Sequence, residues 1–87
     1  MAKASLPEFR LARAAALRVL GQIQTDGAAP ECVQFFNEDA GFIIRLSMDD
    51  LHLQRIISWA QWQQARHVIA REVVSRMLEE LARADIN

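Results

Sequence analysis

The sequence has few of the residues that cross-link a chain or interrupt its secondary structure. Its 87 residues include one cysteine, two prolines and three glycines, and there is no tyrosine. A single cysteine excludes an internal disulfide framework and is typical of a protein from the reducing cytoplasm. The apolar neighbours of that cysteine, Cys32, predict a buried thiol. Few chain breakers and a hydrophobic fraction of 52% together exclude a disordered chain.

Long apolar runs and a strong net charge are also missing. The longest uninterrupted apolar run, Ala14–Leu17, is far too short to span a membrane, and no signal-peptide pattern precedes it. The net charge of −1 excludes the overall positive field that a general nucleic-acid binder carries. We therefore expect one small cytoplasmic domain, residues 1–87, with no membrane association. At this length, stability is either marginal or completed by association with another chain.

The sequence contains no spacing of residues that is typical of catalysis or of metal binding. The only side chains suited to acid–base or metal chemistry are Cys32, Asp49, Asp50, His52, His67 and Glu72. They form no metal-ligand or nucleophile motif, and no glycine-rich phosphate loop is present. We therefore expect a non-enzymatic protein with no cofactor and no metal.

The first half of the chain predicts a helix followed by a β-hairpin. Ser5 and Glu8 have the spacing of a helix-capping box, and apolar residues then recur at helical spacing to about Gln24. Residues 32–47 have apolar, strand-forming ends around a polar turn at residues 37–41, where Gly41 can adopt a positive φ. A hairpin of this kind has to pack on helices or extend into a sheet between subunits.

The second half of the chain predicts helix from Ser47 to about Ala84. Ser47, Asp49 and Asp50 have the pattern of a helix N-terminus, and no glycine or proline follows them. The apolar face changes around residues 61–66, which predicts a bend or short break near residues 63–66. The overall prediction is a small α+β domain in the order helix, hairpin, helix, helix, in which the last two are either separate or one bent helix.

On that predicted helix, one apolar stripe is sufficient to pack the helix against the core of its own chain. This stripe consists of Leu53, Ile56, Ile57 and Ala60. A second stripe lies roughly on the opposite side of the helix. The members of this second stripe are Met48, Leu51, Arg55, Trp59, Trp62 and Arg66. Tryptophan and arginine are enriched at interface hot spots, so the stripe predicts a binding surface, and we name it the Trp/Arg row. An alternative, which the sequence leaves open, is that the two tryptophans cover the hairpin inside the monomer.

The Trp/Arg row favours a protein-binding module, either an adaptor or an inhibitor, that binds an unidentified protein partner. An apolar face of this extent is most simply covered by a second copy, which predicts a homodimer. Such proteins are common on mobile genetic elements, although no residue here indicates that origin.

An alternative function comes from residues 42–82, which resemble the ribbon-helix-helix family of dimeric DNA-binding regulators. The resemblance consists of the strand FIIRLS, a capped helix and a second amphipathic helix that ends in REVVSRMLEEL. In that family, strands of two subunits pair, and their outward side chains enter the major groove of DNA. The resemblance implies that Ile43, Arg45 and Ser47 would be these DNA-contacting side chains.

Overall fold

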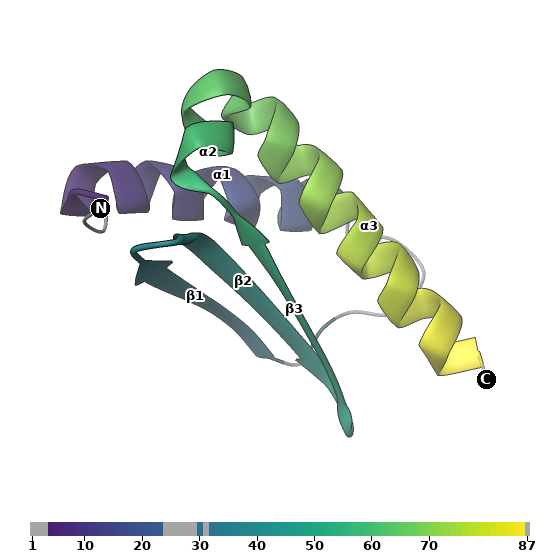
Figure 1. The fold of residues 1–87 in the computed structure, drawn as a ribbon. Helices are drawn as coiled ribbons and strands as arrows, with labels where there is room; N and C mark the ends of the chain where they lie inside the picture. The colour runs from purple at the N-terminus through teal and green to yellow at the C-terminus, as the bar shows by residue number, and fades with distance from the viewer. Residues whose placement is uncertain (1–3, 24–29, 31, 87) are drawn as a thin grey trace.

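The structure is a computed structural model that describes residues 4–23, 30 and 32–86. A helix precedes a three-stranded antiparallel sheet, and two further helices follow the sheet (Figure 1). The elements are α1 (Leu6–Ile23), β1 (Cys32–Glu38), β2 (Gly41–Met48), β3 (Leu51–Ile57), α2 (Trp59–Ala65) and α3 (His67–Ile86). The predicted α+β class is confirmed, with one strand more than expected.

The first helix begins where its capping residues predict. The Ser5 carbonyl accepts a hydrogen bond from the Phe9 amide at 2.9 Å, and the Ser5 hydroxyl accepts one from the Glu8 amide at 3.3 Å. The helix then buries a face rich in small side chains, of which Ala12 and Ala16 are fully buried. Small side chains allow the helix backbone to lie close to its neighbours.

The predicted hairpin is formed by β1 and β2. The two strands pair antiparallel from Cys32 opposite Ser47 to Glu38 opposite Gly41. Gly41 has a φ of 158°, so the positive φ expected at this turn is confirmed.

The prediction of a helix beginning at Ser47 is wrong, because residues 51–57 form a third strand. Asp49 and Asp50 form a turn, in which Asp49 has a φ of 54°, and Leu51 then pairs with Met48. Serine and aspartate favour turns for the same reason that they favour helix caps, since their side chains hydrogen-bond nearby backbone groups. The local pattern therefore did not distinguish a helix start from a strand-to-strand turn.

The core lies between one face of the sheet and the two long helices. Alternate residues of β2 are buried on that face, from Phe42 to Met48, together with Ile57 at the end of β3. These residues form one cluster with the small residues of α1 and with the buried stripe of α3, which consists of Ala70, Val74, Met77, Leu78 and Leu81. Both helices therefore cover the same face of the sheet.

The helical segment after the sheet is broken near the place that the sequence predicted. The short helix α2 ends at Ala65, and Arg66 leaves the helical conformation with φ 41° and ψ −111°. The helix α3 begins at the next residue, His67. The predicted break near residues 63–66 is thus confirmed, and Figure 1 shows α2 as a compact turn between β3 and α3.

The start of α2 is held by a complete capping box at Ser58. The Ser58 hydroxyl accepts a hydrogen bond from the Gln61 amide at 3.1 Å, and the Gln61 side chain accepts one from the Ser58 amide at 3.0 Å. We expect Ser58→Ala to lower the free energy of unfolding by about 1 kcal/mol, because the Gln61 amide loses its acceptor, the Ser58 hydroxyl. Urea denaturation would measure this loss. Ser58→Asp is the matched control, since it keeps an acceptor at the cap; equal losses in the two variants would contradict the capping role.

Candidate functional site

The Trp/Arg row is not a helix face in the structure. Met48 ends β2, Leu51 and Arg55 lie on β3, Trp59 and Trp62 lie on α2, and Arg66 follows α2. Met48 is 9% exposed and Trp62 only 1%, so both belong to the core. The prediction of a second apolar helix face is therefore wrong, because the segment that was to carry half of it is a strand. The interface role of the four less buried residues stays a prediction.

The two tryptophans attach α2 to the rest of the fold. The indole Nε1 of Trp62 donates a hydrogen bond to the Glu8 carboxylate of α1 at 3.2 Å, and Gln63 donates to the same carboxylate at 2.7 Å. The Nε1 of Trp59 donates to the Glu38 carbonyl at the end of β1 at 2.8 Å. Trp59 thus lies against the hairpin within one chain, as the alternative predicted for both tryptophans, while Trp62 is buried in the core next to α1.

Arg55 also has an intramolecular partner. Its guanidinium group donates to both carboxylate oxygens of Glu80 on α3, at 2.7 and 2.8 Å. The pair is nearly half exposed, so its contribution to stability is small. Its effect is to join the edge strand β3 to α3.

The face of the sheet that the helices do not cover is the best candidate for a binding surface, and we name it the open face. Its central row crosses all three strands, since Phe36 pairs with Ile43 and Ile43 pairs with Ile56. None of these three side chains belongs to the core cluster, and Ile56 is 48% exposed. Phe36 and Ile43 are partly buried, so the open face presents a continuous apolar row that is partly exposed.

Polar rows follow the apolar row along the strands. The next row consists of Gln34, Arg45 and Gln54, and the one beyond it of Cys32, Ser47 and His52. In the last row the Ser47 hydroxyl and the His52 Nδ1 are 2.9 Å apart, within hydrogen-bond distance. Cys32 is exposed, so the prediction of a buried thiol is wrong. On the other side of the apolar row, Glu38 lies at the end of β1, on the same face as Phe36.

The open face carries the residues that the ribbon-helix-helix resemblance selected, but in a different arrangement. Ile43, Arg45 and Ser47 share one face of β2, as the alternation predicted. However, β2 is the central strand and pairs with β1 on one side and β3 on the other. Its hydrogen-bonding edges are therefore occupied within the chain, and a strand follows it where that family has a helix. The ribbon that the resemblance implies cannot form through β2.

The electrostatics of the open face centre on Arg45. Its guanidinium group is exposed and, among the described residues, forms no ion pair within 4.0 Å. Sequence reasoning found Arg45 and Ile43 but missed Phe36 and Ile56. A partial signal was available in the segment LHLQRII, where His52, Gln54 and Ile56 alternate with Leu51, Leu53 and Ile57; the exposed Arg55 interrupts this alternation.

Two further observations concern the described part of the chain as a whole. None of its helices is long and apolar enough to cross a membrane. Its histidine, cysteine, aspartate and glutamate side chains form no group of three that could hold a metal ion.

Comparison with known proteins gave no relative. No protein-family model matches the chain, and no curated protein or solved structure is significantly similar to it.

Proposed function

We propose that the protein is a small, non-enzymatic protein-binding module that forms a homodimer through the open face of its sheet. The observation that carries the proposal is the apolar row of Phe36, Ile43 and Ile56 across three strands. Exposed apolar rows bordered by polar residues are typical of protein-binding surfaces, because covering them removes apolar area from water.

The charges on the open face support a second copy as the occupant. Consider a twofold axis that runs across the strands along the apolar row, between two sheets packed face to face. This axis places Ile43 against Ile43 of the second copy. It also places the row of Arg45 over the row of Glu38 in the second copy, because these two rows flank the apolar row on opposite sides. Each Arg45 then gains a carboxylate partner that it lacks among the described residues of its own chain.

Beyond the dimer, the proposed role is that of an adaptor or an inhibitor, which acts by occupying the surface of a further protein. A dimer formed through the sheets would leave both helical layers exposed at its two ends. Such a dimer could bind two partner molecules at once or block one of them.

The test of the proposal is a charge exchange between Arg45 and Glu38. We expect the wild type to be a dimer at micromolar concentration. Arg45→Glu and Glu38→Arg should each weaken dimerisation by at least about tenfold, because each single change brings two like charges together at both of the contacts that the twofold axis relates. Equilibrium sedimentation would measure the dissociation constants. A mixture of the two single variants, and the double variant that carries both changes, should regain the wild-type affinity, since both restore opposite charges.

The control for the charge exchange is Arg13→Glu on the exposed side of α1. It changes the net charge as Arg45→Glu does but leaves the open face intact, so its dimer should match the wild type. A wild type that stays monomeric up to hundreds of micromolar would contradict the proposal, as would single variants that dimerise normally.

A further inference from the structure

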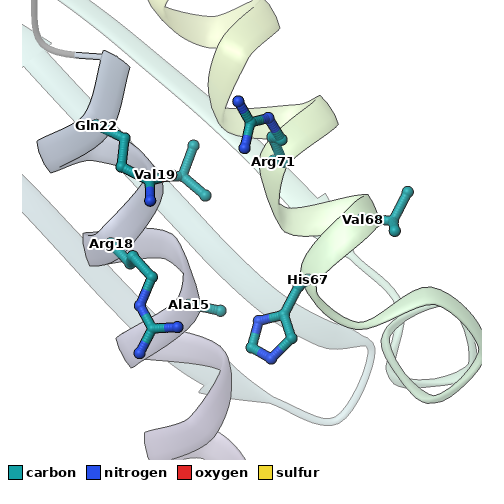
Figure 2. A pocket seen from close by; sticks show the side chains of 7 residues that line it. All are labelled: Ala15, Arg18, Val19, Gln22, His67, Val68 and Arg71. Carbon is teal, nitrogen blue, oxygen red and sulfur yellow. The ribbon is translucent and has the colours of Figure 1, made fainter.

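A cavity of about 330 Å³ opens between α1 and α3, on the helical layer that lies across the core from the open face. It lies beside the last turns of α1 and the first turn of α3. Figure 2 shows its lining residues, which are Ala15, Arg18, Val19, Gln22, His67, Val68 and Arg71. Its volume is at the lower end of the range for small-molecule sites.

The polar side chains of the cavity come from both helices, and each of them has at least one N–H donor. Arg18 and Gln22 come from α1, and His67 and Arg71 come from α3 (Figure 2). No carboxylate lines the cavity among the described residues. The ion pairs of the described chain involve other arginines, namely Arg55, Arg66, Arg76 and Arg83. Two guanidinium groups thus line one small cavity without a compensating negative charge in the described part of the chain.

The remaining walls of the cavity are apolar. Ala15 and Val19 of α1 are buried at its base, while Val68 of α3 is 70% exposed. Val19 points from α1 towards α3 (Figure 2) and offers contact to the organic part of a ligand whose anionic group is held by the two arginines, which form no ion pair among the described residues. Guanidinium groups bind phosphate through paired N–H donors, which gives them both strength and directionality.

We propose that this cavity binds a small organic phosphate monoester. Arg18 and Arg71 hold the phosphate group, His67 and Gln22 contribute further N–H donors, and Val19 contacts the organic group. The site is independent of the proposed dimer, because none of its residues lies on the sheet.

The test uses three probes and two-dimensional NMR of the full chain labelled with ¹⁵N. Phenyl phosphate should shift the amide signals of residues 15–22 and 67–71, inorganic phosphate should shift the same signals with lower affinity, and phenol alone should shift none. Arg18→Gln and Arg71→Gln should each weaken phenyl phosphate binding by at least about tenfold, because each removes a charge-assisted contact. Both side chains are exposed, so both variants should fold, which their spectra would verify.

The controls are Arg13→Gln on α1 and Arg76→Gln on α3, which remove the same charge from the same helices outside the cavity. They should leave the affinity for phenyl phosphate within about twofold of the wild type. If they weaken binding as much as the cavity variants do, the loss of affinity comes from the change in net charge, and the proposal is wrong. Absence of binding at millimolar phenyl phosphate would overturn it, and so would binding of a short nucleic-acid duplex without binding of the monoester.

Discussion

Replacing Trp62 with alanine is expected to lower the free energy of unfolding by about 3–5 kcal/mol, which is the largest single effect we expect in this chain. Trp62 is 1% exposed and is the largest fully buried side chain. It fills the space between α2 and α1, and its ring lies edge-on to His67 at 6.2 Å between centroids. Removal leaves a cavity and takes away one of the two donors to the Glu8 carboxylate, since Gln63 remains as the other. Because the total free energy of unfolding of a small protein is about 5–15 kcal/mol, the variant should lose a large part of its stability.

Urea denaturation followed by circular dichroism would measure this loss, with Val68→Ala as the control. Val68 is 70% exposed, so its truncation should change the stability by less than about 0.5 kcal/mol. Trp62→Phe should lie between the two, because it keeps an aromatic ring but loses the hydrogen bond to Glu8. A Trp62→Ala variant as stable as Val68→Ala would show that Trp62 is a surface residue.

The second large effect is expected at Gly41, where β2 begins. A Cβ added there would lie 2.3 Å from the Ile57 carbonyl oxygen and 2.9 Å from the Ser58 Cα, both of which are backbone atoms. Gly41 also has a φ of 158°, which residues with a side chain rarely adopt. We expect Gly41→Ala to cost about 2–4 kcal/mol, since backbone strain and overpacking each cost about 1–3 kcal/mol.

Gly21→Ala is the matched control for Gly41→Ala. Gly21 lies inside α1, and a Cβ there would meet no atom within 4 Å. Alanine should therefore stabilise the helix by up to about 1 kcal/mol, because it restricts the unfolded chain and favours helix. Thermal unfolding of both variants should show shifts of opposite sign. Shifts of the same sign would contradict the close approach between Gly41 and the end of β3.

Local patterns were sufficient to predict about half of the fold. The helix after Ser5, the hairpin around residues 37–41 and the buried stripe of α3 each have one clear periodicity and a recognisable end. The break at Arg66 was predictable because the apolar face of a continuous helix stays on one side, and here the apolar face changes sides.

The third strand was not predictable from local patterns, because its apolar residues satisfy two periods. Leu53, Ile56 and Ile57 have helical spacing, while Leu51, Leu53 and Ile57 also satisfy the alternation of a strand. Arg55 interrupts that alternation at a position directed towards the helices. It is tolerated there because β3 is an edge strand and Glu80 of α3 is within reach. Pairing with β2 is a long-range interaction that no window of sequence contains.

The prediction of the binding surface was wrong for the same reason, because it assumed a helix where β3 lies. The Trp/Arg row followed from the wrong helix, whereas the apolar row of the open face follows from strand register. Phe36, Ile43 and Ile56 come from three separate strands and become neighbours only through pairing. In the sequence each of them stands beside an apolar residue of the opposite face, so no local pattern sets it apart as a surface residue.

The central claim, that two copies associate through their open faces, is tested most directly by isotope-filtered NMR on a mixture of labelled and unlabelled protein. We expect contacts between copies from Ile43 to Ile43, from Ile56 to Ile56 and from Phe36 to Phe36, because an axis along the apolar row places each of these residues opposite its own copy. At a protein concentration between the dissociation constants of the wild type and of Arg45→Glu, they should weaken in Arg45→Glu and return in the double variant. Contacts between copies that involve the exposed Leu11, Leu17 or Val68 of the helical layer instead would contradict the claim, as would their complete absence at millimolar protein concentration.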